Sequence, residues 1–475
     1  MRGAVLVCGT SSGAGKSLVV TGLCRLLARD GVRVAPFKAQ NMSNQSAVTA
    51  DGGEIGRAQW AQAVAAGVEP EVAMNPVLLK PDGDATSQVV VSGRVAGRTT
   101  ARGWGEQAPS LLPVVLDALA DLRRRFDVVV AEGAGAAAET NLLDRDIVNL
   151  PLAAAAGMPA VLVADIERGG MFASVAGTFA VLPDELRSCL RGVIVNRFRG
   201  DRALLVDGIV DLEARTGVPV LGVLPWLAGV SIDAEDGLDL DVAGGAGPLD
   251  VAVVRLPHLA NATDVEPLQI EPSVSVRFVS HPAALGRPHL VVLPGTKASV
   301  ADLAWLRATG LDRAIADSGA TVLGICGGYQ MLGRHIDDDV ESAAGRVDGL
   351  GYLPHSTMFA TEKVVRRRRA GALGHTVDGY EIHHGVVDGP TGWLAHSNDG
   401  RWWGTSGHGL FEHDGFRHDF LALVAGRAGV PYEPGSASWV DVRREQHDRL
   451  ADALATHLDL GRLRAIVAEG AQVAA

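Results

Sequence analysis

Two segments of the sequence combine residue types and spacings that suit catalysis. The first, residues 9–17 with the sequence GTSSGAGKS, follows an apolar run and precedes a helical pattern. Backbone N–H groups of glycines can turn toward phosphate oxygens, a helix N-terminus attracts anions, and Lys16 can reach terminal phosphates. Position 10 carries Thr10 where the strict motif has glycine, so the segment is a variant phosphate-binding loop. Ser17 is predicted to ligate Mg²⁺.

A second apolar run, residues 128–131, ends at Glu132. Phosphate-loop folds place a metal-directed carboxylate at the carboxyl edge of the sheet, which favours a metal role for Glu132 over a capping role. Lys38 directly follows the apolar run 32–37. It could supply a further cation for a transferring phosphoryl group, or it could be a surface lysine.

The second catalytic segment is residues 321–330, TVLGICGGYQ, an apolar run that ends at Cys326 before two glycines. This is the cysteine form of a nucleophile elbow, in which a sharp turn exposes the sulfur and the following N–H groups form an oxyanion hole. The helix that follows favours the thiolate. The alternative is a buried structural cysteine, which the glycines around the turn disfavour. Upstream, Gly295 in the segment VVLPGTK could add a second oxyanion N–H.

A thiolate nucleophile needs a base, and the C-terminal third of the chain contains several histidines. The candidates are His383 and His384 in GYEIHHG and His408 in GHGLFE. Spacing alone does not choose among these three.

The elements that must position these residues form two series. Short continuous apolar runs joined by helical patterns indicate parallel sheets covered on both faces, and therefore an α/β fold. The first series has predicted strands at 4–8, 32–37, 128–131, 160–164, 192–195 and 220–223, with helical patterns at 17–30 and 56–66. The second has predicted strands at 251–256, 274–279, 290–293 and 321–325. Between them, residues 234–250 are rich in Gly, Asp and Ala, which is typical of a linker.

Length and composition are consistent with this division. A chain of 475 residues is expected to form two or three domains. A formal charge of −12 argues against general binding of nucleic acid, and the basic run 366–369 is predicted to be a solvated loop. The four cysteines form no C-x-x-C pair, which fits a reducing compartment. The most apolar stretch, 150–164, contains two prolines and is too short to span a bilayer. We therefore expect a cytoplasmic protein without membrane or nucleic-acid partners.

With these features together, the chain closely resembles the cobyric acid synthase family of cobalamin biosynthesis. The most specific stretches are residues 36–43, PFKAQNMS, and 49–59, TADGGEIGRAQ. The resemblance extends from the phosphate loop to beyond Phe420. It implies an N-terminal phosphate-loop domain similar to dethiobiotin synthetase over 1–240, a linker at 241–250, and a class I glutamine amidotransferase domain over 251–475.

The resemblance also implies roles for individual residues. Cys326 would attack the glutamine amide with His408 as its general base, and the third member of the triad stays open, with Glu412 as a candidate. Residues expected to contact glutamine or its oxyanion are Gly295, Gly327 and Gln330. Residues expected to bind ATP are Thr10, Gly13, Gly15, Lys16, Ser17, Lys38, Asn196 and Arg197. Metal ligands are expected to be Ser17, Asp51 and Glu132.

The implied reaction amidates the b, d, e and g carboxylates of adenosylcobyrinic acid a,c-diamide, each with one glutamine and one ATP. ATP and Mg²⁺ are thus expected as substrate and ion, without a tightly bound prosthetic group. The partners would be glutamine and the corrinoid, and a homo-oligomer is left open.

Three alternative functions fit the sequence less well than this one. Partitioning ATPases carry a signature lysine five residues before the loop lysine, where this chain has Ser11, and they have no use for a Cys326 domain. The other two, cobyrinic acid a,c-diamide synthase and the related cell-wall amidotransferases, are disfavoured by residues 37–43 and 49–59.

Overall fold

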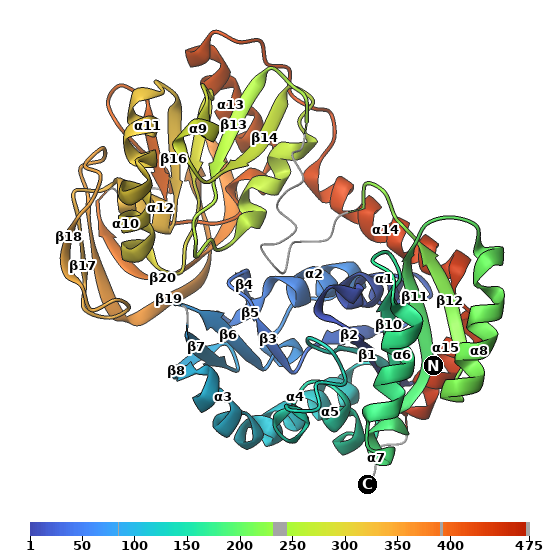
Figure 1. Cartoon of the computed structure of the whole chain (residues 1–475). Coiled ribbons are helices and arrows are strands. Elements are labelled where there is room, and N and C mark those ends of the chain that lie inside the picture. The colour runs from blue at the N-terminus through green and yellow to red at the C-terminus, as the bar shows by residue number, and fades with distance from the viewer. Residues whose placement is uncertain (84, 231–244, 390–392, 472–475) are drawn as a thin grey trace.

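The computed structural model describes residues 1–83, 85–230, 245–389 and 393–471, which fold into two large α/β units with smaller sheets between them (Figure 1). The α/β fold predicted from the apolar runs is therefore confirmed. Among the described residues, no helix combines the length and apolarity needed to cross a membrane.

The N-terminal unit is built on a six-stranded parallel sheet with the order β12-β11-β10-β1-β9-β2. All six strands predicted in this half are present. Their bounds are β1 (Gly3–Gly9), β2 (Val34–Phe37), β9 (Val128–Glu132), β10 (Ala160–Asp165), β11 (Leu190–Phe198) and β12 (Val220–Pro225).

Alternate residues of the central strand β1 face opposite sides of this sheet. Ala4, Leu6 and Cys8 belong to one apolar core, and Val5 and Val7 belong to another. Both sides are therefore covered, which explains why the strands are continuously apolar.

The helices of this unit lie on the two faces. Helices α4 to α6 contribute to the core around Ala4, and α1 contributes to the core around Val5. The bounds are α1 (Lys16–Arg29), α2 (Arg57–Ala66), α3 (Ala101–Gln107), α4 (Leu112–Arg125), α5 (Leu150–Ala155), α6 (Met171–Val181), α7 (Asp184–Arg187) and α8 (Val206–Thr216). The 3₁₀ helices are η1 (Ser12–Ala14), η2 (Val72–Met74), η3 (Ala108–Leu111), η4 (Leu143–Arg145) and η5 (Arg202–Leu205).

Two small sheets from the N-terminal half lie toward the second unit (Figure 1). One has the order β3-β6-β7-β8, and the other pairs β4 with β5. Their bounds are β3 (Gln40–Met42), β4 (Ser46–Val48), β5 (Glu54–Gly56), β6 (Val77–Pro81), β7 (Thr86–Val91) and β8 (Arg94–Thr100). Periodicity did not predict these short strands.

The C-terminal unit contains a second sheet with the order β14-β13-β15-β16-β22-β21, parallel except for β21. Its strands are β13 (Leu249–Val254), β14 (Val274–Val279), β15 (Leu290–Leu293), β16 (Thr321–Ile325), β21 (Ala395–His396) and β22 (Trp402–Thr405). Its helices are η6 (Ala262–Ile270), α9 (Pro282–Leu285), α10 (Ser299–Thr309), α11 (Leu311–Asp317), α12 (Gly327–Leu332), η7 (Leu410–Glu412) and α13 (Asp414–Ala428).

A four-stranded sheet, β18-β17-β19-β20, extends this unit toward the first. Its strands are β17 (His335–Asp338), β18 (Gly345–Asp348), β19 (Ser356–Ala372) and β20 (His375–Asp388). The basic run 366–369 lies inside β19, so its prediction as a loop was wrong. The basic run is stabilised within the strand because Arg366 and Arg368 both pair with the carboxylate of Glu381 on the neighbouring strand β20.

The last two helices return to the first unit, although residues 251–475 were expected to form one domain. Helix α14 (Trp439–His457) packs against α1, and Leu454 lies in the same apolar core as Val5. An ion pair between Arg25 of α1 and Asp448 of α14, at 2.8 Å, joins the same two helices. Helix α15 (Leu460–Glu469) packs against β1. The expected linker at 241–250 falls partly outside the described residues, and its last two residues already belong to β13.

Candidate active sites

The glycine-rich loop connects the end of β1 to the start of α1, as predicted. Gly15 has a φ of +96°, and a Cβ there would come within 2.0 Å of Asn196 Nδ2. Only glycine fits this left-handed, crowded position without strain. Asn196 Nδ2 donates to the carbonyl of Ala14 at 2.9 Å, and the Thr10 N–H donates to the carbonyl of Val163 at 3.0 Å. Strands β10 and β11 thus hold the loop in place.

The Lys16 ammonium group lies over the loop. Its Nζ donates to the carbonyls of Ser11, Ser12 and Gly135 at 3.0, 3.0 and 2.9 Å. These backbone acceptors hold the charge where a terminal phosphate would approach a loop of this kind.

Glu132 gathers the other polar side chains of this site. Its buried carboxylate accepts from Ser17 Oγ at 2.8 Å and Lys38 Nζ at 2.8 Å on one oxygen, and from Gln62 Nε2 at 2.5 Å on the other. The structure therefore brings Ser17, Lys38 and Glu132 together, as the sequence predicted. Gln62 was not predicted, because nothing in its local sequence points to a distant carboxylate.

A pocket opens beside these residues. It is lined by Ser12, Lys16, Ser17, Lys38, Gln40, Asn41, Met42, Ala101, Trp104, Gly105, Glu132, Ala134, Gly135, Ala136, Glu139, Leu142, Arg145, Asp146, Val148 and Asn149. Met42 and Leu142 are about half exposed, at 51% and 48%. The pocket is therefore lined both by the phosphate loop and by exposed apolar side chains, Met42 and Leu142.

Two of the expected ligands lie apart from this pocket. Asp51 lies between β4 and β5, where its carboxylate accepts from Thr49 Oγ1 at 2.5 Å, and the adjacent Gly52 faces the carbonyl of Val365. It is not among the described residues that line the pocket, so the structure does not bring it together with Ser17 and Glu132 there. Arg197 has a φ of +60° and pairs with Asp165 at 2.9 Å, outside the described lining of this pocket.

Cys326 lies at the junction of β16 and α12. Its φ is +50° and its ψ −106°, an uncommon conformation for a residue with a side chain and one that a sharp strand-to-helix turn requires. The Cys326 N–H donates to the carbonyl of Thr405 at 2.7 Å, which ties the turn to β22. Its Sγ lies 3.8 Å from the carbonyl oxygen of Ile382 in β20.

His408 lies next to Cys326 and is held by Asp264 of η6. The His408 Nδ1 and Asp264 Oδ2 are 2.7 Å apart, and the Gly409 N–H donates to Asp264 Oδ1 at 2.9 Å. Both side chains are buried. Burial alone would lower the pKa of His408, but the charge of Asp264 and hydrogen bonds to Asp264 and Cys326 raise that pKa to about 10.

The residues expected to surround the reacting amide also converge here. A Cβ on Gly295 would lie 3.2 Å from His408 Cε1, and a Cβ on Gly327 would lie 2.5 Å from Thr296 Cγ2. Glycine at these positions therefore lets the backbone pack closely against His408 and Thr296. Gln330 Oε1 accepts from Ser299 Oγ at 2.8 Å, and both residues line the Cys326 pocket.

Comparison with known proteins finds a family match for each half of the chain. A model for the CobQ/CobB/MinD/ParA nucleotide binding domain matches residues 5–240, and one for the CobB/CobQ-like glutamine amidotransferase domain matches residues 250–416. The cobyric acid synthase of Frankia casuarinae is 49% identical, with 99% of this chain and 98% of that protein covered. The cobyric acid synthases of Streptomyces coelicolor and Mycobacterium sp. (strain KMS) are 50% and 51% identical, covering 99% and 98% of this chain and 97% of each relative.

The chain belongs to the cobyric acid synthase family. It is therefore an enzyme of the glutamine amidotransferase class, with a nucleotide-binding domain, as the resemblance implied. The relatives match over nearly the whole chain, which favours this family over the a,c-diamide synthases, the cell-wall amidotransferases and the partitioning ATPases.

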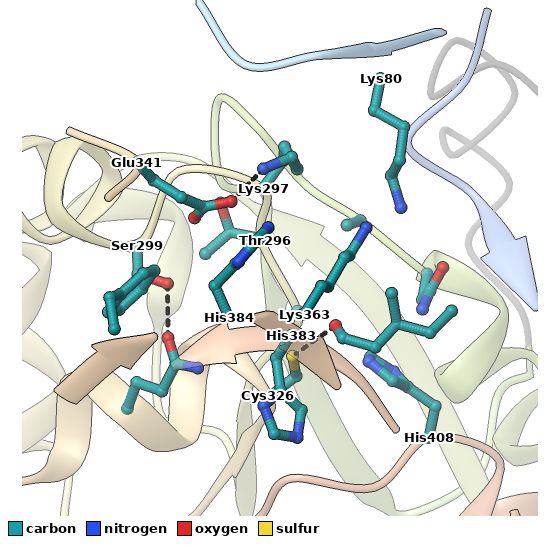
Figure 2. Close-up of a pocket in the computed structure, with 16 residues that line it drawn as sticks. Lys80, Thr296, Lys297, Ser299, Cys326, Glu341, Lys363, His383, His384 and His408 are labelled. Atoms are coloured by element: carbon teal, nitrogen blue, oxygen red, sulfur yellow. Dashed lines mark hydrogen bonds and ion pairs between the residues drawn. The ribbon is translucent and has the colours of Figure 1, made fainter. Parts of the chain in front are cut away.

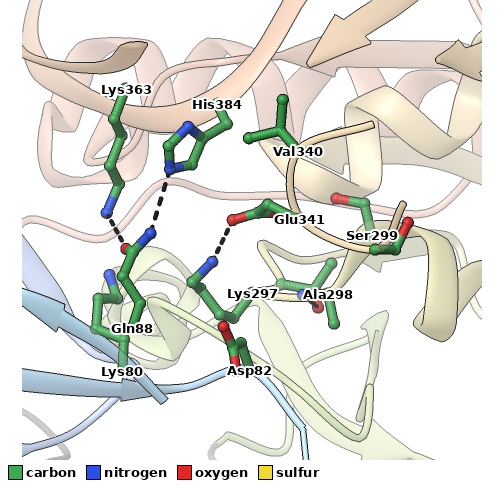
Figure 3. A network of polar contacts seen from close by, with 12 residues as sticks. Lys80, Asp82, Gln88, Lys297, Ala298, Ser299, Val340, Glu341, Lys363 and His384 are labelled. Atoms are coloured by element: carbon green, nitrogen blue, oxygen red, sulfur yellow. Dashed lines mark hydrogen bonds and ion pairs between the residues drawn. The ribbon is translucent and has the colours of Figure 1, made fainter. Parts of the chain in front are cut away.

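Within this family member, the geometry separates the three candidate histidines. His384 Nε2 lies 3.3 Å from Gln88 Nε2 (Figure 3), and its Nδ1 lies 3.0 Å from the carbonyl of Ala360. Both ring nitrogens are therefore occupied. Burial lowers the pKa of His383 to about 4, and no carboxylate accepts a hydrogen bond from its ring among the described residues. His408 alone of the three has a carboxylate to orient it.

Glu412 is not the residue that orients His408. It pairs with Arg57 at 2.8 Å and with Arg443 at 3.0 Å. Its position four residues after His408 made it a candidate for that role. The structure shows instead that its carboxylate joins Arg57 of α2 to Arg443 of α14. The carboxylate that orients His408 belongs to Asp264, which lies 144 residues earlier in the chain. No local sequence motif predicts this contact.

The Cys326 pocket lies against the first domain, whose Lys80 is one of the residues that line it (Figure 2). A buried cluster of charges closes this contact. Glu54 of β5 accepts from Lys80 of β6 at 2.5 Å and from Lys363 of β19 at 2.6 Å. Burial opposes the charge on Glu54, but the two lysines hold its pKa well below the usual range. Lys80 and Lys363 both line the pocket, so residues of both domains form its wall.

Proposed function

We propose that this enzyme converts adenosylcobyrinic acid a,c-diamide to adenosylcobyric acid by amidating the b, d, e and g carboxylates. Each amidation uses one ATP and the ammonia from one glutamine. The observation that carries the proposal is that one chain holds a phosphate loop beside a Ser17–Glu132–Lys38 cluster and a Cys326–His408–Asp264 arrangement. The two sites lie in domains that meet through buried contacts.

In the glutamine site, the Cys326 thiolate attacks the side-chain amide carbon. The negative charge that develops on the amide oxygen is accepted by backbone N–H groups at Gly327 and Gly295. His408 supplies a proton to the departing ammonia and then takes one from the water that hydrolyses the thioester. Because Asp264 holds the Nδ1 side of the ring, Nε2 is the nitrogen left for these transfers.

In the ATP site, a corrinoid carboxylate oxygen attacks the γ-phosphorus and ADP leaves, which gives an acyl phosphate. Lys16 and the loop N–H groups hold the phosphates, and Lys38 faces the transferring group. The Ser17 hydroxyl and the Glu132 carboxylate are hard oxygen donors that fit Mg²⁺, an ion that, when bound, neutralises phosphate charge. Ammonia then attacks the acyl carbon, and phosphate leaves.

The corrinoid would enter at the apolar part of the phosphate pocket. Met42 and Leu142 are exposed there, and Trp104 lies with them in the lining. A corrinoid presents a broad apolar ring with carboxylates at its edge, and Arg145 lies in the same wall to pair with a carboxylate. A Cβ on Gly105 would come within 2.6 Å of Arg145 Nη1, so glycine makes room for this side chain.

Mass spectrometry of the purified enzyme with ATP, glutamine and the a,c-diamide tests the proposal. Each replacement of OH by NH₂ lowers the corrinoid mass by one unit, so four successive steps are expected. Product formation must stop when either ATP or glutamine is left out. A product mass that stays at the starting value, or phosphate release without amidation, would contradict the assigned reaction.

A further inference from the structure

One buried segment connects the Cys326 pocket to the phosphate site. It starts at Glu54 in β5, which holds Lys363 of the Cys326 pocket at 2.6 Å. It ends at Gln62 in α2, whose Nε2 donates to Glu132 at 2.5 Å. Helix α2 and strand β5 lie between the two large units (Figure 1). A single stretch of chain thus reaches both sites.

Gln59 and Gln62 lie on the same face of α2, because residues three apart on a helix are neighbours. Both side chains are fully buried. Gln59 Oε1 accepts from Asn41 Nδ2 at 3.0 Å, and Asn41 lines the phosphate pocket. Gln62 must present its Nε2 to the Glu132 carboxylate, which can only accept.

Each glutamine keeps one polar atom without a partner among the described residues. These atoms are Gln59 Nε2, a donor, and Gln62 Oε1, an acceptor. An unsatisfied buried polar atom destabilises a fold, so its presence in a helix calls for a reason. A donor and an acceptor one turn apart would both be satisfied by a small ligand that accepts one hydrogen bond and donates another.

Gly56, at the start of α2, lies close to the side-chain amides of Gln59, Asn41 and Asn75. A Cβ on Gly56 would lie 2.6 Å from Gln59 Oε1, 2.8 Å from Asn41 Nδ2 and 3.0 Å from Asn75 Oδ1. Any side chain larger than hydrogen would therefore push these three amides apart. Glycine at position 56 therefore allows this polar group to form at the start of α2.

We propose that Gln59 and Gln62 form a binding station for neutral ammonia on its way from Cys326 to the phosphate site. The inference rests on the proposed function. The ammonia lone pair accepts from Gln59 Nε2, and an ammonia N–H donates to Gln62 Oε1. Ammonium has no lone pair, so the Gln59 donor selects the neutral form, which is the nucleophile that the acyl phosphate needs. From Gln62 the next group is Glu132, at the site of acyl phosphate formation.

The test measures glutamate released and corrinoid amide formed in the same reaction. Wild-type enzyme is expected to form about one amide per glutamate. Gln59→Leu is expected to keep releasing glutamate while amide per glutamate falls about tenfold, the effect of one lost hydrogen bond on transfer. The missing nitrogen should appear as free ammonia in solution. Amidation with added ammonium should persist in Gln59→Leu, because that ammonia enters through the phosphate pocket.

Two further variants make the test decisive. Gln59→Met keeps the side-chain length and should show the same uncoupling. Thr178→Val removes a buried hydroxyl on α6, where its Oγ1 donates to the Ser174 carbonyl, and should keep the wild-type ratio. A wild-type ratio in both Gln59 variants would overturn the inference, as would equal losses with glutamine and with ammonium. If wild-type enzyme forms no amide from either nitrogen source, the proposed function itself fails.

Discussion

His408 Nδ1 lies 2.7 Å from Asp264 Oδ2, although 144 residues separate the two side chains in the sequence. The contact fixes the imidazole so that Nδ1 carries its proton toward Asp264 and Nε2 is left for the cysteine. Asp264 is itself held by the Gly409 N–H at 2.9 Å, so one carboxylate orients both the ring and the backbone beside it. The pair is fully buried, which strengthens its mutual attraction.

Asp264→Asn should lower glutamine hydrolysis by about 10²-fold, because the ring loses its orienting charge. His408→Ala should cost at least as much. His384→Ala serves as the matched control, since that histidine lines the same pocket but both of its nitrogens are occupied, and its loss should be far smaller. Glutamate release by the three purified variants checks this order, and an equal or larger loss in His384→Ala would move the base away from His408.

The same pair predicts how stability depends on pH. The folded-state pKa of His408, about 10, lies above its ordinary value of 6.5. The protonated pair therefore stabilises the fold fully below pH 6.5, and this contribution is lost as the pH rises through 10. The difference in melting temperature between wild type and Asp264→Asn should be widest near pH 6.5 and should narrow toward pH 10. A difference that grows with pH would contradict the assigned charge state.

Lys16→Ala should abolish amidation from glutamine and from ammonium alike, while leaving some glutamine hydrolysis. The reason is that Lys16 lies on the phosphate loop, away from Cys326, and acts on ATP alone. Amide formation and glutamate release measured side by side separate the two half-reactions. Normal amide formation in this variant would remove the loop from the mechanism.

Glu54→Gln should destabilise the enzyme by about 3–5 kcal/mol, because two buried lysines would lose the countercharge that they share. Asp378→Asn is a suitable control, since it breaks an ion pair with Arg369 that is largely exposed to solvent and should change stability little. Denaturant unfolding of the two variants gives the comparison. Equal small effects would mean that the Glu54 cluster adds little to the contact between the domains.

The sequence was most informative where function depends on consecutive residues. The phosphate loop, Glu132 and the Cys326 turn follow apolar strands directly, so their positions at the sheet edge could be predicted from local pattern. The parallel sheets could be predicted for the same reason, because strands buried on both faces are continuously apolar.

Features that depend on distant parts of the chain could not be predicted in this way. Asp264, Gln62 and the Glu54 cluster reach their partners only through tertiary folding, and carboxylates and amides are common at such positions without any role. Helix α14 crosses back to α1 from the end of the chain, and its apolar face carries no sign of which domain it will cover. Closeness in sequence can also mislead. Glu412 lies four residues after His408, which suggested a contact between the two, but its carboxylate pairs with Arg57 and Arg443 instead.

In the proposed reaction, Cys326 serves only to release ammonia for an acyl phosphate made in the other domain. Cys326→Ala should therefore lose glutamine hydrolysis and glutamine-supported amidation together. High ammonium at mildly alkaline pH, where more neutral ammonia is present, should restore amide formation, and ATP should still be required. A packing role for the cysteine would instead cost about 1–3 kcal/mol of stability and spare glutamine use. The decisive measurement is corrinoid amide formed by folded Cys326→Ala with glutamine and then with ammonium. Rescue by ammonium alone is the predicted result, and retained glutamine activity or failed rescue would contradict the account.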